Sequence, residues 1–503
     1  MPFYRDLCHS IQSNRLNFQY NCFYLSDAIE KDVLQPTVNP IVNCTIWDGM
    51  VLLQQMANVP LSTFGDVAEY ILVRILQSKM VYFVTDQYRS GSIKSYERER
   101  RKESGTVKIS IERRDQARPK QWSKYLRDGE NKTNLIEFLF KDWSTNSKYA
   151  KLLEGKILYM NHGNHFHKLS SPGGKMVVCE EVPELATNQE EADTKVFLCA
   201  NHAATKKQTS VCIKTVDSDI PIYALYFAER IPIKMYVEMT CCNRRRVLDI
   251  NCIQQELGEK LCAALPALHA FTGNDYTSAF HGLGKKKAYT ILSRSTEYQE
   301  TFAALGDRFV LNSKHFPVIE RFVCELYGVR NCENSDEARY LKFCDKKKTP
   351  EPQKLPPTRD VVLCHLKRVN FVTAIIRLSL EQFPDIPKPD KVYGWILEND
   401  VLEVQWMLRN PIPEELVDLI SCNCKKTMCE SNHCICKSHG LKCTDLCSCK
   451  KECKNKPDEE TLGLEFENDS DVDFEIEKED LFDIDDESES GSGENTSESE
   501  SEH

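Results

Sequence analysis

Three short apolar runs, each followed by aspartate, restrict the fold of this chain more than any other feature. They read "VNCTIW" before Asp48, "MVYFVT" before Asp86 and "SVCIKTV" before Asp217 and Asp219, and longer stretches with helical character separate them. Short β-rich runs alternating with helical segments predict parallel strands joined by helices. Because the carboxyl ends of parallel strands meet at one crevice of a sheet, we expect these acids to converge there.

Two more acidic elements belong with the strand-end aspartates. The stretch "NQEEAD" places Glu190, Glu191 and Asp193 in the first turn of a predicted helix, and Asp275 lies in "GNDYTSAFHGLGKKKA". Any one of these acids could serve only as a helix cap, but their repetition along the chain weakens that interpretation. Carboxylates crowded into one crevice cannot all stay ionised without compensation, and a divalent metal ion is the compensation we expect.

The order of these acids resembles that of flap-endonuclease and XPG-type nucleases, which contain a PIN domain, and of Asteroid-like proteins. "EAD" is similar to the E-x-E element of that family, "DSD" to its D-x-D element, and residues 273–288 to its G-x-D-Y element with the following helix–two-turn–helix. The resemblance implies an α/β PIN-like fold, a parallel sheet with helices on both faces. It also implies two Mg²⁺ or Mn²⁺ ions. The implied ligands are Asp48, Asp86, Glu191, Asp193, Asp217, Asp219 and Asp275.

The segment after Asp275 combines glycines with lysines and is our candidate for phosphate binding. Glycines allow backbone amides to approach a phosphate closely, and lysines hold the phosphates of duplex DNA. A solvated helix face is the alternative for the lysine triplet. The candidate DNA-binding residues are Gly282, Gly284, Lys285, Lys286 and Lys287.

A second basic segment, "RSGSIKSYERERRKES", follows Asp86 directly. Lys94 and Arg101 lie seven residues apart, on one face of a predicted helix. By the resemblance they are the catalytic basic residues that contact the scissile phosphate. A salt-bridged surface helix is an equal alternative for Arg98 and Arg100.

The cysteines are concentrated near the end of the chain. Nine of the 23 lie within residues 422–453, where little else could form a core. Zinc prefers four thiolate or imidazole ligands, so nine thiolates could saturate two ions with one sulfur left over, or three ions if three sulfurs bridge. A disulfide knot or a loose metal-binding sponge is the alternative, and a reducing compartment disfavours the knot.

The cysteine spacing resembles that of the tesmin-type CXC domain. This resemblance implies three zinc ions and DNA binding, and it covers about 35 residues, including "GLKCT" and Asn455. Interspersed lysines predict salt-sensitive phosphate contacts with little sequence preference. The implied zinc ligands are Cys422, Cys424, Cys429, Cys434, Cys436, Cys443, Cys447, Cys449 and Cys453.

The net charge of −11 conceals an asymmetry. Residues 458–503 hold 21 acidic residues and one basic residue, which leaves a net charge of +9 in residues 1–457. A basic body is typical of a protein that binds DNA, with RNA as the alternative, and the acidic tail suits basic proteins such as histones. The chain has no apolar run of 18 residues and no secretory signal at its start, so we expect no membrane partner and a nuclear location, with the cytoplasm as the alternative.

The predicted organisation has five parts. They are an N-terminal extension (1–42), a PIN-like nuclease domain (43–300), a helical region (301–415), a CXC zinc–cysteine module (422–455) and a disordered acidic tail (457–503). The stretch "NHGNHFHKLSSPGGK" contains three histidines, and we expect an irregular loop there rather than a zinc site.

The expected function is a divalent-metal-dependent, structure-specific DNA nuclease that hydrolyses phosphodiester bonds and carries a zinc–cysteine DNA-binding tail. The alternative is a catalytically inactive, mobile-element-derived protein that binds DNA or chromatin. This alternative arises because a PIN-like body joined to a CXC tail also resembles mobile-element-related animal proteins. A metal-dependent cleavage assay separates the two.

Overall fold

The computed structural model describes residues 29, 42–88, 91–96, 108–241, 244–344, 352–399 and 401–408, and parts of the cysteine-rich region: 422–424, 429–431, 433–438, 443, 447–449 and 453–455. The chain divides into two compact units, Met1–Glu414 and Glu415–His503. Most of the expected N-terminal extension and the whole of 457–503 lie outside the described residues.

An eight-stranded sheet organises the first unit, in the order β5-β4-β3-β2-β1-β6-β7-β8. The strands are β1 Cys44–Asp48, β2 Met80–Val84, β3 Ile157–His162, β4 His165–Ser170, β5 Val178–Glu181, β6 Ser210–Thr215, β7 Lys234–Cys241 and β8 Arg244–Asp249. The central strands β3, β2, β1, β6 and β7 are parallel, whereas β4, β5 and β8 pair antiparallel at the edges. Ile46 of β1 lies beside Tyr82 of β2 and beside Ile213 of β6, so the strand order reverses at β1.

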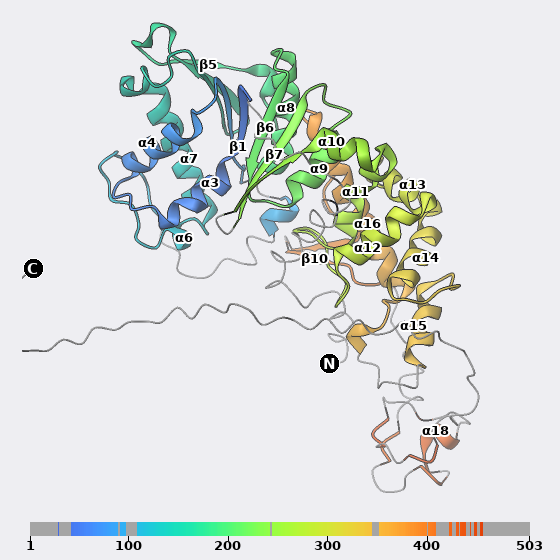
Figure 1. The fold of residues 1–503 in the computed structure, drawn as a ribbon. Coiled ribbons are helices and arrows are strands. Elements are labelled where there is room, and N and C mark those ends of the chain that lie inside the picture. Colours follow the sequence, from blue (N-terminus) through green and yellow to red (C-terminus); the bar gives the residue numbers. More distant parts are fainter. Residues whose placement is uncertain are drawn as a thin grey trace, which may run out of the picture. The chain divides into compact units, whose positions relative to one another are not determined.

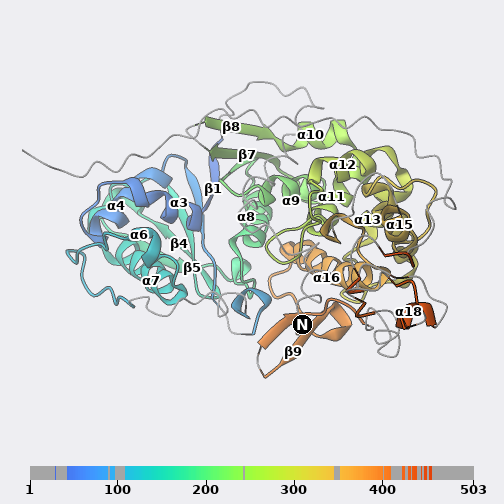
Figure 2. The same cartoon turned by 90° about the horizontal axis from the view of Figure 1, so that it is seen from below.

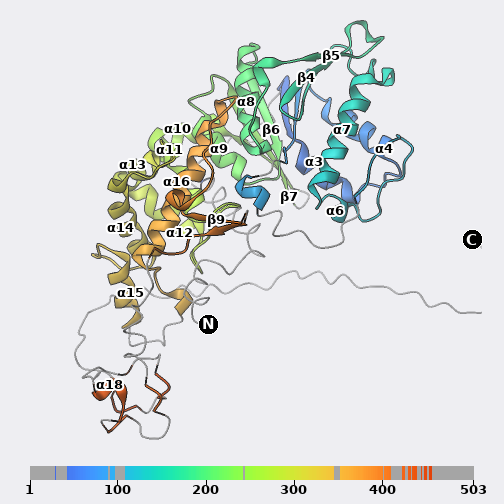
Figure 3. The same ribbon diagram turned by 180° about the vertical axis from the view of Figure 1, so that it is seen from behind.

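Helices cover both faces of the sheet because successive strand residues point to opposite sides. In β2, Tyr82 and Val84 belong to one buried core, while Val81 and Phe83 belong to another. The second core contains α3 Gly49–Gln55, α4 Phe64–Ile75, α6 Trp122–Tyr125 and α7 Gly129–Thr145, and the first contains α8 Ala192–Thr205, α9 Asp219–Phe227, α10 Ile250–Leu257 and α11 Glu259–Phe271. Figures 1 and 3 show α4 and α7 on one side of the strands and α8 and α9 on the other. The expected α/β fold class is confirmed.

Local sequence signals explain how the helices of the second core are fixed. Helix α4 begins with a capping box, in which Thr63 Oγ1 accepts from the Asp66 amide at 3.1 Å and Asp66 Oδ2 accepts from the Thr63 amide at 2.9 Å. Helix α7 then packs beside α4, because the buried indole of Trp143 donates to the carbonyl oxygen of Ala68 at 3.0 Å. These contacts hold the helical layer that lies against β1 and β2.

Four of the remaining helices continue the first core: α12 Lys285–Arg294, α13 Thr296–Ala304, α14 Phe316–Leu326 and α16 Arg359–Arg377. The fifth, α15 Ser335–Phe343, places Ala338 in a small separate cluster with Cys324, Val329 and Cys332. Phe271, the last residue of α11, contacts the rings of Phe280, Phe322 and His365, so the turn after α11 and the helical region share one apolar centre. Figure 2 shows α9, α11 and α16 packed together.

A hairpin and several short turns complete the first unit. The hairpin of β9 Trp395–Glu398 and β10 Val401–Val404 was not expected within the helical region, and Trp395 packs against the Phe371 ring with centroids 5.3 Å apart. The 3₁₀ turns are η1 Met56–Asn58, η2 Ser147–Tyr149, η3 Pro172–Gly174, η4 Pro183–Leu185, η5 Ser313–His315, η6 Pro352–Lys354, η7 Leu378–Leu380 and η8 Lys391–Tyr393. In the second unit, α18 spans Ile435–Ser438.

The histidine-rich stretch corrects one expectation. It forms the hairpin of β3 and β4 instead of an irregular loop, and His162 pairs with His165 across a two-residue turn of Gly163 and Asn164. Gly163 has a φ of 58°, as such a turn requires. The Phe140 ring lies 4.6 Å from the rings of both His162 and His167, so these histidines pack as part of the sheet surface.

Within the described part of the chain, no helix combines the length and the apolar character needed to span a membrane.

Candidate active site

The three strand-end aspartates lie at one edge of the sheet because their strands are neighbours and parallel. Asp48 is the last residue of β1, Asp86 follows β2 by two residues, and Asp217 follows β6 by two residues. Since β1 separates β2 from β6, the three acids flank the point where the strand order reverses. Open α/β sheets bind ligands in the crevice at this point.

Asp48 both caps a helix and faces the crevice. Its Oδ1 accepts from the amides of Met50 and Val51 at 3.0 and 3.3 Å, and its Oδ2 accepts from Thr215 Oγ1 at 3.3 Å. Burial, and then the neighbouring Asp86, raise the pKa of Asp48 to about 7. Asp48 can therefore cap α3 and also belong to the group of converging acids.

Helix α8 brings Glu191 and Asp193 to the same crevice. The Ala192 amide, in the first turn of α8, donates to Asp86 Oδ1 at 2.9 Å, which ties the helix start to the end of β2. Burial and then Asp86 raise the pKa of Glu191 to about 7, against the opposing effect of Lys94. Burial and the nearby Asp217 also raise the pKa of Asp193 well above its ordinary value.

Asp217 and Asp219 form a tight turn into α9. The Asp217 amide donates to Thr215 Oγ1 and the Asp219 amide donates to Asp217 Oδ1, both at 2.9 Å. Burial and the adjacent Asp219 raise the pKa of Asp217. Burial would also raise the pKa of Asp219, but His269, Lys285 and Lys94 together hold it below its ordinary value. The His269 Nε2 atom lies 2.9 Å from Asp219 Oδ1.

Asp275 lies in the loop after α11 and is the most open member of the set, with 67% of its side chain exposed. It interacts electrostatically with Asp217. The seven acids therefore converge from separate parts of the chain. We call them the carboxylate cluster: Asp48, Asp86, Glu191, Asp193, Asp217, Asp219 and Asp275.

Lys94 provides the positive charge beside this cluster. Its Nζ lies 2.5 Å from Glu191 Oε2, 3.6 Å from Asp275 Oδ2 and 5.2 Å from the centre of the Tyr276 ring. Burial opposes its charge, but Glu191, Tyr276 and Asp275 outweigh that effect and raise the pKa of Lys94. Arg101, expected to act with Lys94, lies outside the described residues.

The donor set is suited to hard cations. Seven carboxylates offer the oxygen ligands that Mg²⁺ and Mn²⁺ prefer. Burial first, and neighbouring acids after it, raise the pKa values of Asp48, Glu191, Asp193 and Asp217, and a bound cation would favour their charged forms. Among the described residues, sets of three or more donor atoms all within 4.8 Å of one another come from the cysteines. The carboxylate oxygens of the described acids are spread more widely than this.

The lysine triplet divides into one buried and two exposed residues. Lys285 is 3% exposed, and its Nζ donates to the carbonyl oxygens of Gly273 and His269 at 2.5 and 3.0 Å. This corrects the expectation that Lys285 contacts DNA, because its ammonium group is used in hydrogen bonds to carbonyl oxygens at the C-terminal end of α11. Lys286 and Lys287 are exposed in the first turn of α12.

The two glycines before the triplet have open surroundings. A Cβ atom added at Gly282 or Gly284 would meet nothing within 4 Å, and Gly282 has a φ of 69°. The turn is therefore accessible to a ligand that approaches the backbone.

Sequence reasoning missed several residues of this site. His269 and Tyr223 lie on helices, where they gave no signal beyond the apolar pattern, and both contact Asp219. Tyr276 follows Asp275 directly and interacts with Glu191. Residues of α16 and residues 384–389 line a cavity together with several of these acids, although the sequence predicted only a scaffold in that part of the chain.

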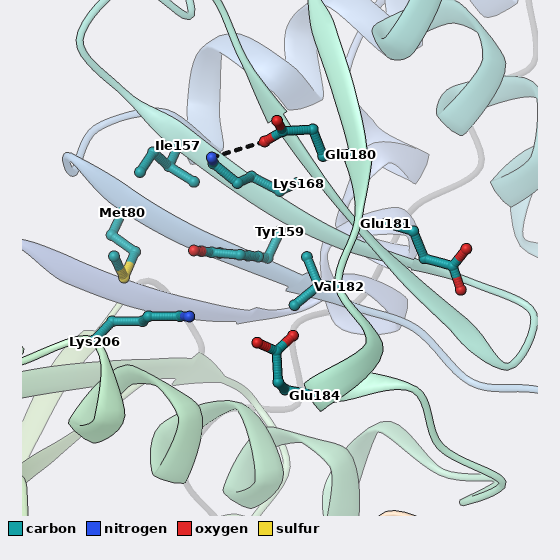
Figure 4. Close-up of a pocket in the computed structure, with 9 residues that line it drawn as sticks. All are labelled: Met80, Ile157, Tyr159, Lys168, Glu180, Glu181, Val182, Glu184 and Lys206. Carbon is teal, nitrogen blue, oxygen red and sulfur yellow. Dashed lines mark hydrogen bonds and ion pairs between the residues drawn. The ribbon is translucent and has the colours of Figure 1, made fainter.

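A separate hollow of about 480 Å³ lies at the end of the strands opposite to these acids (Figure 4). It is lined by Met80 and Ile157, the first residues of β2 and β3, and by a Lys168–Glu180 ion pair of 2.9 Å. Since the carboxylate cluster lies beyond the other ends of the strands, this hollow does not belong to it.

The cysteines of the second unit gather as overlapping sets. Four sets of four have all their sulfur atoms within 4.8 Å of one another. They are Cys422, Cys424, Cys429 and Cys434; Cys422, Cys434, Cys436 and Cys443; Cys422, Cys443, Cys447 and Cys449; and Cys429, Cys443, Cys449 and Cys453. All nine cysteines take part, and Cys422 and Cys443 each belong to three sets, as expected of bridging ligands.

Sulfur distances and hydrogen bonds agree with metal binding by this cluster. The Sγ atoms of Cys422 and Cys429 are 3.5 Å apart, far beyond the disulfide bond length of about 2.05 Å. Asn455 Nδ2 donates to Cys443 Sγ at 3.3 Å, and the Asn455 amide donates to Cys453 Sγ at 3.4 Å. Such donors orient metal-bound thiolates and tune their basicity.

Comparisons with known proteins give weak similarity. No family model and no curated protein matches the sequence. The T5 D15 protein co-crystallised with metal ions has a TM-score of 0.31 and 14% identity, over 67% of this chain and 91% of that one. A bacteriophage T5 D15 flap endonuclease variant, in a pseudo-enzyme–product complex with DNA and metal ions, has a TM-score of 0.30 and 13% identity, over 67% and 90% of the chains.

T5 5'-exonuclease with bound zinc has a TM-score of 0.29 and 12% identity, over 68% of this chain and 99% of that one. TM-scores of this size do not by themselves establish a shared fold. The fold class therefore rests on the strand order, the two helical layers and the position of the acids.

Proposed function

We propose that this protein is a nuclease that hydrolyses DNA phosphodiester bonds with Mg²⁺ or Mn²⁺. One observation carries the proposal: seven carboxylates from distant segments meet at the carboxyl ends of parallel strands, and Lys94 lies among them. When bound, two divalent ions supply an activated water and stabilise the leaving oxygen. The ions would be held by Asp48, Asp86, Glu191, Asp193, Asp217, Asp219 and Asp275.

The chain's own residues supply orientation and charge. Lys94 carries a stable positive charge beside Glu191 and Asp275, where it would attract the scissile phosphate. Lys286 and Lys287, exposed after the open glycine turn, would hold the DNA backbone. Arg101 remains a proposed partner of Lys94.

The cysteine-rich unit is proposed to bind three zinc ions and to tether DNA through phosphate contacts. The overlapping sulfur sets support shared ligands, since twelve ligand positions must come from nine cysteines. We also propose that the acidic tail binds basic proteins such as histones, and that the protein acts in the nucleus.

The test is cleavage of flap, bubble and single-stranded DNA by the full chain, with Mg²⁺ or Mn²⁺ and with a chelator as control. We expect metal-dependent cleavage that falls at least about a hundredfold in Asp217→Asn/Asp219→Asn, as when transition-state charge stabilisation is lost. Glu112→Gln, which removes an exposed acid outside the cluster, should cleave like the wild type. Cleavage that survives in the double variant would refute the proposal.

A non-catalytic DNA- or chromatin-binding protein is the second candidate. Asp48, Asp217 and Asp219 all make local hydrogen bonds that a scaffold would retain without chemistry. DNA binding without cleavage of any substrate under any metal condition would favour this candidate.

A further inference from the structure

Thr85, which directly precedes Asp86, is completely buried and lies just beyond the end of β2 at Val84. Asn161, the fifth residue of β3, provides hydrogen-bond partners for its backbone. Asn161 Oδ1 accepts from the Thr85 amide at 2.7 Å, and Asn161 Nδ2 donates to the Thr85 carbonyl oxygen at 3.1 Å. A side chain of the neighbouring strand therefore fixes the residue that leads into the carboxylate cluster.

Lys195 donates to the same carbonyl oxygen from α8. Its Nζ lies 2.6 Å from the Thr85 carbonyl oxygen, and its side chain is 0% exposed. Lysine is rarely buried completely, because removing an ammonium group from water costs several kcal/mol. A methionine would fill a similar space without that cost, so the buried charge indicates a role other than packing.

The two residues after Thr85 are also tied to the start of α8. The Ala192 amide donates to Asp86 Oδ1 at 2.9 Å, and the Gln87 amide donates to the carbonyl oxygen of Glu190 at 2.7 Å. Three consecutive residues after β2 are therefore held against one end of α8. The same end of α8 carries two acids of the carboxylate cluster.

We propose that Lys195 is a positioning residue that holds Asp86 at a fixed distance from the two acids at the start of α8. Metal ligands must be held within about 0.5 Å of their productive positions by the residues around them. In this role Lys195 acts through the Thr85 carbonyl oxygen and contacts neither DNA nor the ions. The inference rests on the proposed function and adds a residue on which its metal affinity depends.

Two other roles of Lys195 predict different effects on cation binding. If its positive charge acted directly on the cluster, its removal would strengthen cation binding, because like charges repel. If it only joined α8 to the sheet, its removal would lower stability and leave cation binding unchanged. Of the three roles, only positioning predicts weaker cation binding.

The first test measures Mn²⁺ binding to the full chain without DNA, from the electron paramagnetic resonance signal of the free ion. Asp217→Asn/Asp219→Asn defines the background from other sites. We expect Lys195→Met to raise the Kd for Mn²⁺ by about ten- to a hundredfold, the range for residues that orient metal ligands. Lys156→Met is the matched control, because Lys156 Nζ also donates to a carbonyl oxygen, that of Leu76 at 2.7 Å, but at the opposite end of the sheet, just before β3. It should keep the wild-type Kd.

A second pair of variants keeps the test decisive if Lys195→Met does not fold. Asn161→Ala removes the other support of Thr85, and we expect it to raise the Kd for Mn²⁺ as well. Its control is Asn370→Ala, which should leave the Kd unchanged. Asn370 is 3% exposed and also bonds to backbone groups through both atoms of its amide: Oδ1 accepts from the Gly306 amide at 2.9 Å, and Nδ2 donates to two carbonyl oxygens at 2.8 and 2.9 Å.

The outcomes separate this inference from the proposed function. A Kd in Lys195→Met equal to or lower than that of the wild type would overturn the positioning role and leave the nuclease intact. For the second pair, equal Kd values in Asn161→Ala and Asn370→Ala would do the same. A higher Kd in Lys195→Met, in a protein that cleaves no DNA with any metal, would support the positioning role and refute the nuclease. A wild type that binds no Mn²⁺ above the background would overturn both.

Discussion

Lys285 donates from its buried ammonium group to Nδ1 of His269, at 3.2 Å. Because an ammonium group cannot accept, Nδ1 is the acceptor and Nε2 of the same ring carries the hydrogen. The Nε2 atom lies 2.9 Å from Asp219 Oδ1. The first residue of α12 is thereby connected, through one imidazole, to the carboxylate cluster. His269 therefore contacts both the turn proposed to bind DNA and the proposed metal site.

This network predicts that Lys285 contributes to stability rather than to DNA affinity. Lys285→Met leaves buried carbonyl oxygens without their donor, and we expect the free energy of unfolding to fall by about 3 kcal/mol. Lys287→Met, at the exposed position two residues later, should change it little. Chemical denaturation of both variants measures the difference, and equal effects would contradict the buried role.

Lys286 and Lys287 should show the opposite behaviour. Lys286→Ala and Lys287→Ala leave stability unchanged because both side chains are exposed. We expect each substitution to weaken DNA binding and to lower the slope of log Kd against log salt by about 0.9, the contribution of one phosphate contact. Fluorescence anisotropy with duplex DNA at several salt concentrations measures this slope.

Much of the site could be predicted from sequence because its acids follow local patterns. A stretch of a few residues is enough to recognise an aspartate at the end of an apolar run. The parallel arrangement of the strands then brings Asp48, Asp86 and Asp217 together. Lys285 was misassigned because a lysine at a helix start is normally solvated, and its burial depends on where α11 ends. The contact between Gln189 and Ser379 could not be predicted, because it joins residues 190 positions apart in the sequence.

The histidine hairpin was misread for another reason. Glycine, proline and serine near the histidines favoured an irregular loop, yet successive residues of β3 alternate between the two cores, with Leu158 and Met160 in one and Tyr159 in the other, as in a strand. The two-residue turn of Gly163 and Asn164 was the missed signal. That interpretation gave the glycine, proline and serine content more weight than the strand-like pattern of the neighbouring residues.

The carboxylate cluster should destabilise the protein when no cation is bound. Asp193 is partly buried among other acids, and burial and Asp217 raise its pKa. Asp193→Asn removes one repelling charge, so we expect higher thermal stability in a chelator than for the wild type. Addition of Mn²⁺ should raise the melting temperature of the wild type more than that of the variant. Differential scanning fluorimetry with and without Mn²⁺ tests both statements.

Two buried histidines predict loss of stability in acid. Burial and then Arg368 lower the pKa of His365 from 6.5 to about 3, and burial and then Lys206 lower that of His202 to about 4. The unfolded chain binds protons at these residues below about pH 6.5, whereas the folded chain does not. Their contribution is therefore complete above pH 6.5 and is lost as the pH falls, at about 1.4 kcal/mol per pH unit for each.

Urea denaturation between pH 7 and pH 4.5 measures this dependence. His202→Gln should flatten the curve, since glutamine does not titrate. Val392→Ala, an exposed change that involves no titratable group, should leave it unchanged. A curve as steep in His202→Gln as in the wild type would contradict the buried neutral state of His202.

The cysteine cluster predicts unequal effects of its members on zinc content. Cys443 belongs to three of the four sulfur sets, whereas Cys424 belongs to one. Cys443→Ser would therefore remove a ligand proposed to be shared by several ions, and Cys424→Ser would remove a ligand of one ion. We expect two to three zinc ions per chain in the reduced wild type, a loss of more than one ion in Cys443→Ser and of at most one in Cys424→Ser. Cys179→Ser, at an exposed cysteine of β5, should lose none. Elemental analysis of protein purified under reducing conditions gives these numbers, and equal losses in the first two variants would show that the sulfurs do not bridge.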